Sequence, residues 1–145
     1  MCWNDDKYYL ITYNPDYDKP FATYRVDRMT DVEMLDEKAD KYNKAAFKIT
    51  DYIKQNFGMF TGELVAAKIE FDESLVSVVL DQFGADTQLI KSGDNRFTIK
   101  ANVSASPVFL GWIFQFGDLA EIIEPESLRE AMREMIKTVN SVYRK

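Results

Sequence analysis

The sequence predicts an α+β protein in which a small β-sheet unit precedes a larger unit of alternating strands and helices. Three observations lead to this prediction. Residues 7–13 alternate side chains with a period of two, as half-buried strands do, and a second strand-like segment follows at residues 21–29. Residues 36–57 change to apolar spacings of three and four, which is the helical pattern. From residue 62 onward, strand-like and helix-like segments follow one another, separated by residues that cap or break them.

The composition is that of a globular chain with an acidic surface. Its 145 residues are 46% hydrophobic and 14% aromatic, enough for one ordinary domain or two small ones. A net charge of −6 without a strongly basic segment argues against nonspecific binding to duplex DNA. No apolar run approaches the ~20 residues of a membrane helix, and one cysteine cannot form an internal disulfide. We therefore expect a soluble, cytoplasmic protein without a membrane partner.

The absence of histidine restricts the chemistry that the chain can perform. Histidine is the commonest general base and the commonest transition-metal ligand. Serine-hydrolase triads and histidine-based metal sites are therefore excluded. Mechanisms that use only carboxylates remain, but no pair of carboxylates in the sequence has a reason for a shifted pKa. The sequence predicts no enzyme, no catalytic residue, no metal site and no cofactor.

The first predicted unit, residues 1–35, is a meander of three strands. Residues 7–13, KYYLITY, form the first strand, and residues 21–29, FATYRVDRM, form the second after the turn-rich segment NPDYDKP. Residues 32–35, VEML, are predicted as a short third strand. Three strands are too few to bury both faces of a small sheet, so upstream strands or a partner must complete it.

Residues 36–61 are predicted to be a helical connector between the two units. Apolar or small residues recur at spacings of three and four between lysines, namely Ala39, Tyr42, Ala46, Ile49 and Ile53. Thr50 is a candidate cap for a separate short helix that runs to Phe57 and ends at Gly58.

The second predicted unit, residues 62–145, has the clearer patterns. Residues 63–72, ELVAAKIEFD, form a strand with alternate apolar residues directed inward. Asp72 caps the helix that follows, and Gly84 ends it. Two further strands, TQLIK and RFTIKANV, flank the hairpin turn SGDN at residues 92–95.

The rest of this unit completes an alternating order of elements. Ser106 and Pro107 begin a helix, with serine at the cap and proline at the first helical position. Residues 120–123, AEII, form the fourth strand, and Pro125 opens a long final helix. The order strand, helix, strand, strand, helix, strand, with an additional C-terminal helix, is the ferredoxin-like arrangement.

Two features of these last helices allow more than one interpretation. One interpretation places the aromatic residues around Trp112 in a cofactor pocket, but their helical spacing beside a sheet favours a core role. The final helix has an apolar stripe that packs on its own sheet or on a second copy, formed by Leu128, Met132, Met135, Ile136, Val139 and Tyr143. The helix start at Ser106 offers backbone N–H groups for an anion, but without a Gly-rich loop a plain cap is favoured.

Several short motifs occur in order along nearly the whole chain. Tyr8-Tyr9-Leu10 is followed by Tyr24-Arg25-Val26-Asp27-Arg28-Met29, and then by MFTGE, FDES, LDQFGAD, WIFQFG and EIIEPESLRE. Together they resemble the C-terminal part of a WYL-domain transcriptional regulator, with Tyr8 in place of the family's Trp. The first unit resembles the end of the WYL domain, and the second resembles the C-terminal extension domain.

This resemblance implies a layout and a role. Such regulators have a winged helix-turn-helix, then a WYL domain with a small Sm-like β-barrel, then the extension domain. We expect this chain to be a fragment, or a product without its N-terminal part, that keeps a partial Sm/SH3-like β-barrel. Promoter DNA would be contacted only through the missing helix-turn-helix. Because an unfinished barrel leaves unpaired sheet edges, we also expect a homodimer.

The resemblance further implies an anionic effector, single-stranded nucleic acid or a nucleotide, bound by Tyr9, Arg25 and Arg28. Guanidinium groups bind phosphate bidentately, and an aromatic ring can stack on a base. Residues three apart in a regular strand point to opposite faces, so the two arginines converge only if the strand ends or turns near Asp27. In the alternative interpretation, Asp27 pairs with an arginine and the group fixes a barrel corner.

Two further basic residues are candidate ligand contacts. Arg96 and Lys100 share one face of their predicted strand and are candidates to extend the basic site, although solvated residues of a sheet commonly show the same pattern. Tyr8 and Leu10 are expected in the core. The rival function is a dimerisation module with no ligand of its own.

Overall fold

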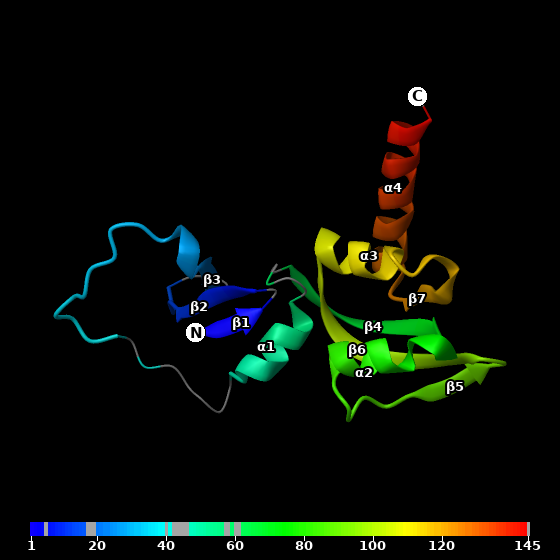
Figure 1. Cartoon of the computed structure of the whole chain (residues 1–145), viewed down its shortest axis with the longest axis horizontal. Coiled ribbons are helices and arrows are strands. Elements are labelled where there is room, and N and C mark those ends of the chain that lie inside the picture. Colours follow the sequence, from blue (N-terminus) through cyan, green and yellow to red (C-terminus); the bar gives the residue numbers. More distant parts are fainter. Residues whose placement is uncertain are drawn as a thin grey trace. The chain divides into compact units, whose positions relative to one another are not determined.

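The computed structural model describes residues 1–4, 6–16, 20–39, 41, 47–56, 59 and 62–144. They belong to two compact units, Met1–Ile49 and Thr50–Lys145. The mixed α/β architecture agrees with the predicted fold class: a three-stranded antiparallel sheet comes first, and a four-stranded sheet with helices follows it (Figure 1).

The sheet of the first unit has the order β1-β2-β3. Its strands are β1 (Cys2–Asn4), β2 (Lys7–Tyr13) and β3 (Phe21–Arg25), and the 3-10 turn η1 (Val26–Arg28) follows β3. The meander of three strands is thus present, but the third strand is β1, at the start of the chain. Its pairing with β2 places Cys2, a buried free cysteine, opposite Tyr9.

The predicted strand at residues 32–35 is wrong. These residues have no regular secondary structure, and Met34 is 99% exposed. Asp31 just before them has a left-handed backbone, with φ of 52°, which interrupts an extended chain. A short alternating segment forms a strand only where a neighbouring strand pairs with it, and none of the described strands does so.

The predicted connector is helical only at its end. Helix α1 spans Ile49–Gln55, close to the short helix predicted from Thr50. Residues 36–39, 41, 47 and 48 are not helical, so the helical prediction is wrong there. Short helices need a packed apolar face, and Ala39 of the predicted stripe is exposed. Tyr42, Ala46, Phe57 and Gly58 lie outside the described residues.

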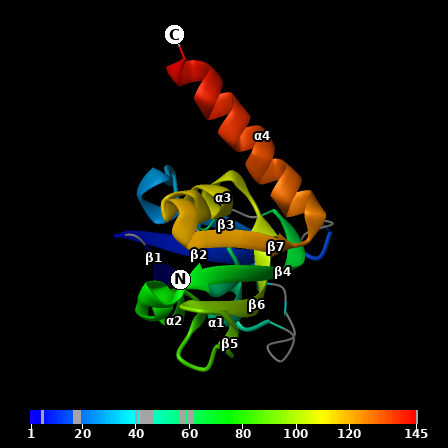
Figure 2. The same cartoon turned by 90° about the vertical axis from the view of Figure 1, so that its right-hand side faces the viewer.

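The second unit has the predicted order of elements. They are β4 (Glu63–Asp72), η3 (Glu73–Leu75), α2 (Val76–Phe83), β5 (Ile90–Gly93), β6 (Arg96–Ala105), α3 (Pro107–Phe114), η4 (Gly117–Leu119), β7 (Ala120–Glu124) and α4 (Glu126–Tyr143). The antiparallel sheet has the order β5-β6-β4-β7 (Figure 2). Counted within this unit, that is second, third, first and fourth strand, which is the ferredoxin-like topology.

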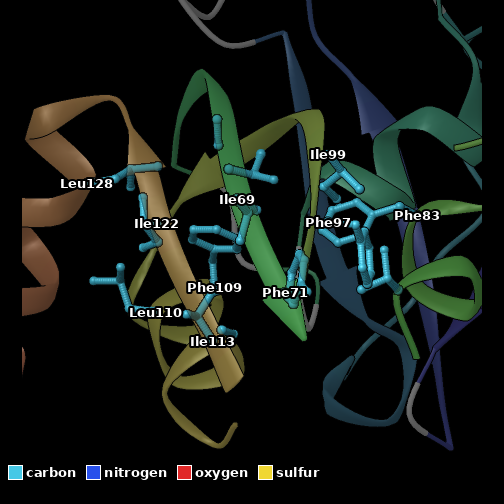
Figure 3. Packing of buried hydrophobic residues seen from close by; sticks show 14 residues of the cluster. Ile69, Phe71, Phe83, Phe97, Ile99, Phe109, Leu110, Ile113, Ile122 and Leu128 are labelled. Carbon is cyan, nitrogen blue, oxygen red and sulfur yellow. The ribbon is translucent and has the colours of Figure 1, made fainter. Parts of the chain in front are cut away.

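The core of this unit lies on one face of the sheet. The register places Ile69 opposite Ile99 and Phe71 opposite Phe97, and all four side chains are buried (Figure 3). Buried residues of α2, α3, β7 and the start of α4 complete this core, among them Val79, Phe83, Phe109, Leu110, Ile113, Ile122 and Leu128. The inward alternation predicted for both central strands is confirmed.

Trp112 belongs to this core. Its ring packs edge-on against those of Phe83, at a centroid distance of 5.7 Å, and Phe116, at 5.0 Å. It also meets Phe71 edge-on at 6.2 Å. Such edge-to-face contacts are a favourable way for aromatic rings to pack in a protein interior. The predicted core role of this aromatic cluster is therefore confirmed.

The caps predicted at Asp72 and Ser106 form hydrogen bonds, but Asp72 caps the 3-10 turn η3 that leads into α2, and α2 itself has no side-chain cap. Thr50 lies inside α1, which begins at Ile49, so the prediction of a cap there is wrong. Asp72 Oδ1 accepts from the backbone N–H of Ser74 at 3.0 Å, and Ser106 Oγ accepts from that of Phe109 at 3.2 Å. Gly84 follows α2 with φ of 109°, a conformation that favours glycine. These local rules set where η3 and α3 begin and where α2 ends.

Replacing Ser106 with alanine should destabilise the second unit by about 1 kcal/mol, because a buried cap is lost at the start of α3. In urea this lowers the unfolding midpoint by roughly 0.3–1 M. Trp112 fluorescence in a Trp3→Phe background measures the unfolding. Ser127→Ala, at an exposed position in the first turn of α4, is the matched control, and equal midpoints for the two variants would contradict the assignment.

Candidate functional site

Arg25, at the end of β3, forms a bidentate ion pair with Asp27. Its Nε donates to Oδ1 at 3.0 Å and its Nη2 donates to Oδ2 at 2.6 Å. These hydrogen bonds raise the pKa of Arg25 and lower the pKa of Asp27. The pairing of Asp27 with an arginine, which was the alternative interpretation of this motif, is therefore present.

The geometry at this corner also meets the condition for Arg25 and Arg28 to converge. Strand β3 ends at Arg25, and the 3-10 turn that follows is closed by a bond from the Met29 N–H to the Val26 carbonyl at 3.2 Å. Arg25 is the cap of this turn, with an extended backbone, and Arg28 is the last of its three residues. Arg28 is exposed and makes no ion pair with any residue of the described ranges.

Tyr9 lies directly opposite Arg25 in the pairing of β2 with β3. After Asp27, the electrostatic effect of Tyr9 is a smaller contribution to the raised pKa of Arg25. Because side chains alternate along a strand, these two residues share one face with Ile11, Tyr13, Phe21 and Thr23. We name this the Arg25 face.

A pocket of about 610 Å³ opens farther along the Arg25 face. Its walls include Ile11, Tyr13 and Phe21 of the sheet together with Phe47. The rings of Phe21 and Phe47 stack with centroids 4.0 Å apart, and Tyr13 lies 5.3 Å from Phe21. Sequence reasoning missed this pocket because Phe47 is far from the sheet along the chain. The alternation of Tyr9, Ile11 and Tyr13 was its only signal.

The opposite face of the same sheet is exposed and aromatic. Trp3 is 60% exposed, Tyr8 is 61% exposed and Tyr24 is 50% exposed. The prediction that Tyr8 is a core residue is therefore wrong, while Leu10 is half-buried. The alternation correctly predicted that Tyr8 and Tyr9 lie on opposite faces of the sheet. It could not predict which of these two faces is buried.

Arg96 and Lys100 have different surroundings in the second unit. Arg96 donates from Nη2 to the Asp118 carbonyl at 2.9 Å and lies opposite Asp72 in the sheet, which gives it a structural contact. Lys100 is exposed and lies directly opposite Lys68. Four residues along β6 separate the two by roughly 13 Å, so they do not form one compact site.

Helix α4 has an apolar stripe that its own fold covers only in part. Leu128 is buried and Met132 and Met135 pack on the core, whereas Ile136 and Val142 are 46% and 59% exposed. The C-terminal half of the helix projects beyond the sheet and α3 (Figure 1 and Figure 2). Beside its first half, a groove of about 420 Å³ runs between α3, β7 and α4.

Among the described residues, no group of three or more cysteine or carboxylate side chains is placed to hold a metal ion. Within the same ranges, every helix is too short or too polar to cross a membrane.

These observations define a ferredoxin-like domain with an additional helix, preceded by a small sheet that presents an arginine corner. The family model of the WCX domain matches residues 63–139, just over half of the chain, and the chain belongs to this family. The WCX domain is the C-terminal extension of WYL-domain proteins, so the predicted relationship to the C-terminal part of a WYL regulator is confirmed.

Membership of this family gives the chain a regulatory role, in a family of domains that are not enzymatic in general. The match begins at the first residue of β4 and ends inside α4, so it covers the ferredoxin-like unit and not the Arg25 face. A comparison with curated proteins finds no match.

The Asp27 carboxyl should titrate below its ordinary pKa, and Arg25→Met should return that pKa toward the ordinary value. Because the folded pKa is lowered, the stabilising effect of the pair is present above the unfolded pKa and is lost as pH falls through the folded pKa. Carboxyl ¹³C shifts followed by NMR between neutral and acid pH measure this. Arg28→Met is the control, and an equal rise in both variants would contradict the specific pairing.

Proposed function

We propose that this chain is the effector-sensing portion of a helix-turn-helix transcription regulator. It binds an anionic effector, single-stranded nucleic acid or a nucleotide, through Tyr9, Arg25 and Arg28, and transmits binding to a DNA-binding domain outside this chain. The observation that supports this proposal is the corner at the end of β3, where Tyr9 and Arg25 are in register and Arg28 follows in the 3-10 turn.

The corner has hydrogen-bonding capacity beyond its ion pair. A guanidinium group has five N–H donors, and Asp27 engages only the Nε and Nη2 of Arg25. After Arg25, the charge of Lys7 also contributes to the lowered pKa of Asp27, which places a further cation near this carboxylate. The three positive charges of Arg25, Arg28 and Lys7 therefore exceed the single negative charge of Asp27. A phosphate can bind there through charge-assisted hydrogen bonds.

A second candidate function is dimerisation through α4. Leu128, Met132, Met135, Val139 and Val142 follow one another at spacings of four, three, four and three, the a/d spacing of a coiled-coil seam. The seam continues past the part of the helix that the core covers. A symmetric dimer buries the same patch of both copies, so one exposed stripe is sufficient to form such an interface.

The effector proposal predicts salt-sensitive binding of a fluorescein-labelled single-stranded oligonucleotide, measured by anisotropy at low and moderate salt. Arg25→Glu/Arg28→Glu should weaken binding by about tenfold or more, since two charge-assisted contacts are lost. The slope of the logarithm of the binding constant against the logarithm of the salt concentration should become shallower by about 0.7 for each lost phosphate contact. Lys91→Glu/Arg144→Glu, with the same change in net charge at other exposed positions, should bind like the unmodified chain. Equal losses in the two double variants would reject a specific site.

The dimerisation candidate predicts that Val142→Asp weakens self-association by about tenfold or more, because a charge enters an apolar seam. Sedimentation velocity over a range of concentrations measures the dimer dissociation constant. Ser141→Asp adds the same charge one residue away at a c position, outside the a/d seam of α4, and should leave the constant unchanged. A chain that is monomeric at every concentration would eliminate this candidate.

A further inference from the structure

We propose that the Arg25 face binds a small amphipathic anion, with a flat apolar ring system in the Phe21–Phe47 pocket and a carboxylate, sulfonate or phosphate group at Arg25. This inference rests on the proposed anion site and names the chemical class of its ligand. A single small molecule would engage both the pocket and Arg25, so a nucleic-acid chain is not required.

The pocket has the size and lining of a small-molecule site. Its volume of about 610 Å³ lies within the range of roughly 300–1,000 Å³ that is usual for such pockets. Phe21, Phe47 and Tyr13 supply aromatic walls, and Ile11 supplies an aliphatic wall next to them. A flat apolar ring gains both buried area and ring contacts in such surroundings.

The strand register sets the spacing between the ring and the anion. Tyr9 and Arg25 form one cross-strand pair, Ile11 and Thr23 form the next pair on this face, and Tyr13 and Phe21 form the one after. Successive pairs on one face are roughly 7 Å apart along the strands. The cationic corner therefore lies one pair away from the near wall of the pocket, within reach of an arginine side chain and a small ligand.

The other face of the sheet offers aromatic surface without this charge. Trp3, Tyr8 and Tyr24 are exposed there, but alternation gives that face of the strands no charged side chain. An apolar ligand could adhere to either face, whereas an amphipathic anion gains from the Arg25 face alone. A matched pair of probes that differ by one anionic group can therefore tell the two faces apart.

Two fluorescent probes provide this test: 8-anilino-1-naphthalenesulfonate and N-phenyl-1-naphthylamine, which has the same rings without the sulfonate. The sulfonate probe should bind the unmodified chain about tenfold or more tighter than the neutral probe. Arg25→Met should abolish this difference and leave the neutral probe unaffected. Phe21→Ala should weaken the binding of both probes. Tyr24→Ala, on the other face of the same strand, should leave the binding of both probes unchanged.

Ala39→Trp provides a second variant in which a bulky side chain fills the pocket without removing an existing ring, and it should weaken both probes as Phe21→Ala does. Circular dichroism establishes that each variant is folded. Equal affinity for the two probes, or losses caused by Tyr24→Ala instead of Phe21→Ala and Ala39→Trp, would overturn the inference. Oligonucleotide binding that depends on Arg25 and Arg28 but survives Ala39→Trp would overturn it too, and would leave the proposed function standing.

Discussion

The antiparallel pairing of β4 with β6 is the interaction on which the second unit depends. The two ten-residue strands pair from Glu63 opposite Ala105 to Asp72 opposite Arg96, and this register aligns the inward rows of Ile69 with Ile99 and of Phe71 with Phe97. A slip of one residue would turn every one of these side chains to the other face. Helices α2 and α3, β5 and β7 all attach to this central pair, so its register fixes the unit.

The same register determines what the outer face of this sheet can bind. Alternation leaves residues such as Lys68, Glu70, Lys100 and Asn102 on that face, and none of its described residues is aromatic. Sheets that read single-stranded RNA commonly stack bases on exposed aromatic rings. The aromatic residues of this unit are instead inside its core, as Phe71 and Trp112 illustrate. The small N-terminal sheet therefore has the better chemistry for a ring-containing ligand.

Local rules predicted the second unit well and the first only in part. Periodicity and the caps at Asp72 and Ser106 predicted its order of elements, because each of these signals acts over a few residues. The third strand of the first sheet could not be predicted in the same way. β1 has only three residues, and its pairing with β2, rather than its own pattern, makes it a strand. The Phe21–Phe47 contact likewise joins residues 26 positions apart, which no periodic pattern reveals.

Sequence motifs could name candidate residues for the site, but not the pocket beside them that Phe47 helps to line. The motif named Tyr9, Arg25 and Arg28, and Asp27 was recognised as the alternative partner. An exposed pair such as Arg25–Asp27 stabilises a fold only slightly, so its main effect is to hold the guanidinium group at the end of β3. An anion that binds Arg25 must share this guanidinium group with Asp27 or displace the carboxylate. Asp27 is also the middle residue of η1, so an anion bound at Arg25 would act directly on the turn that leads out of the sheet.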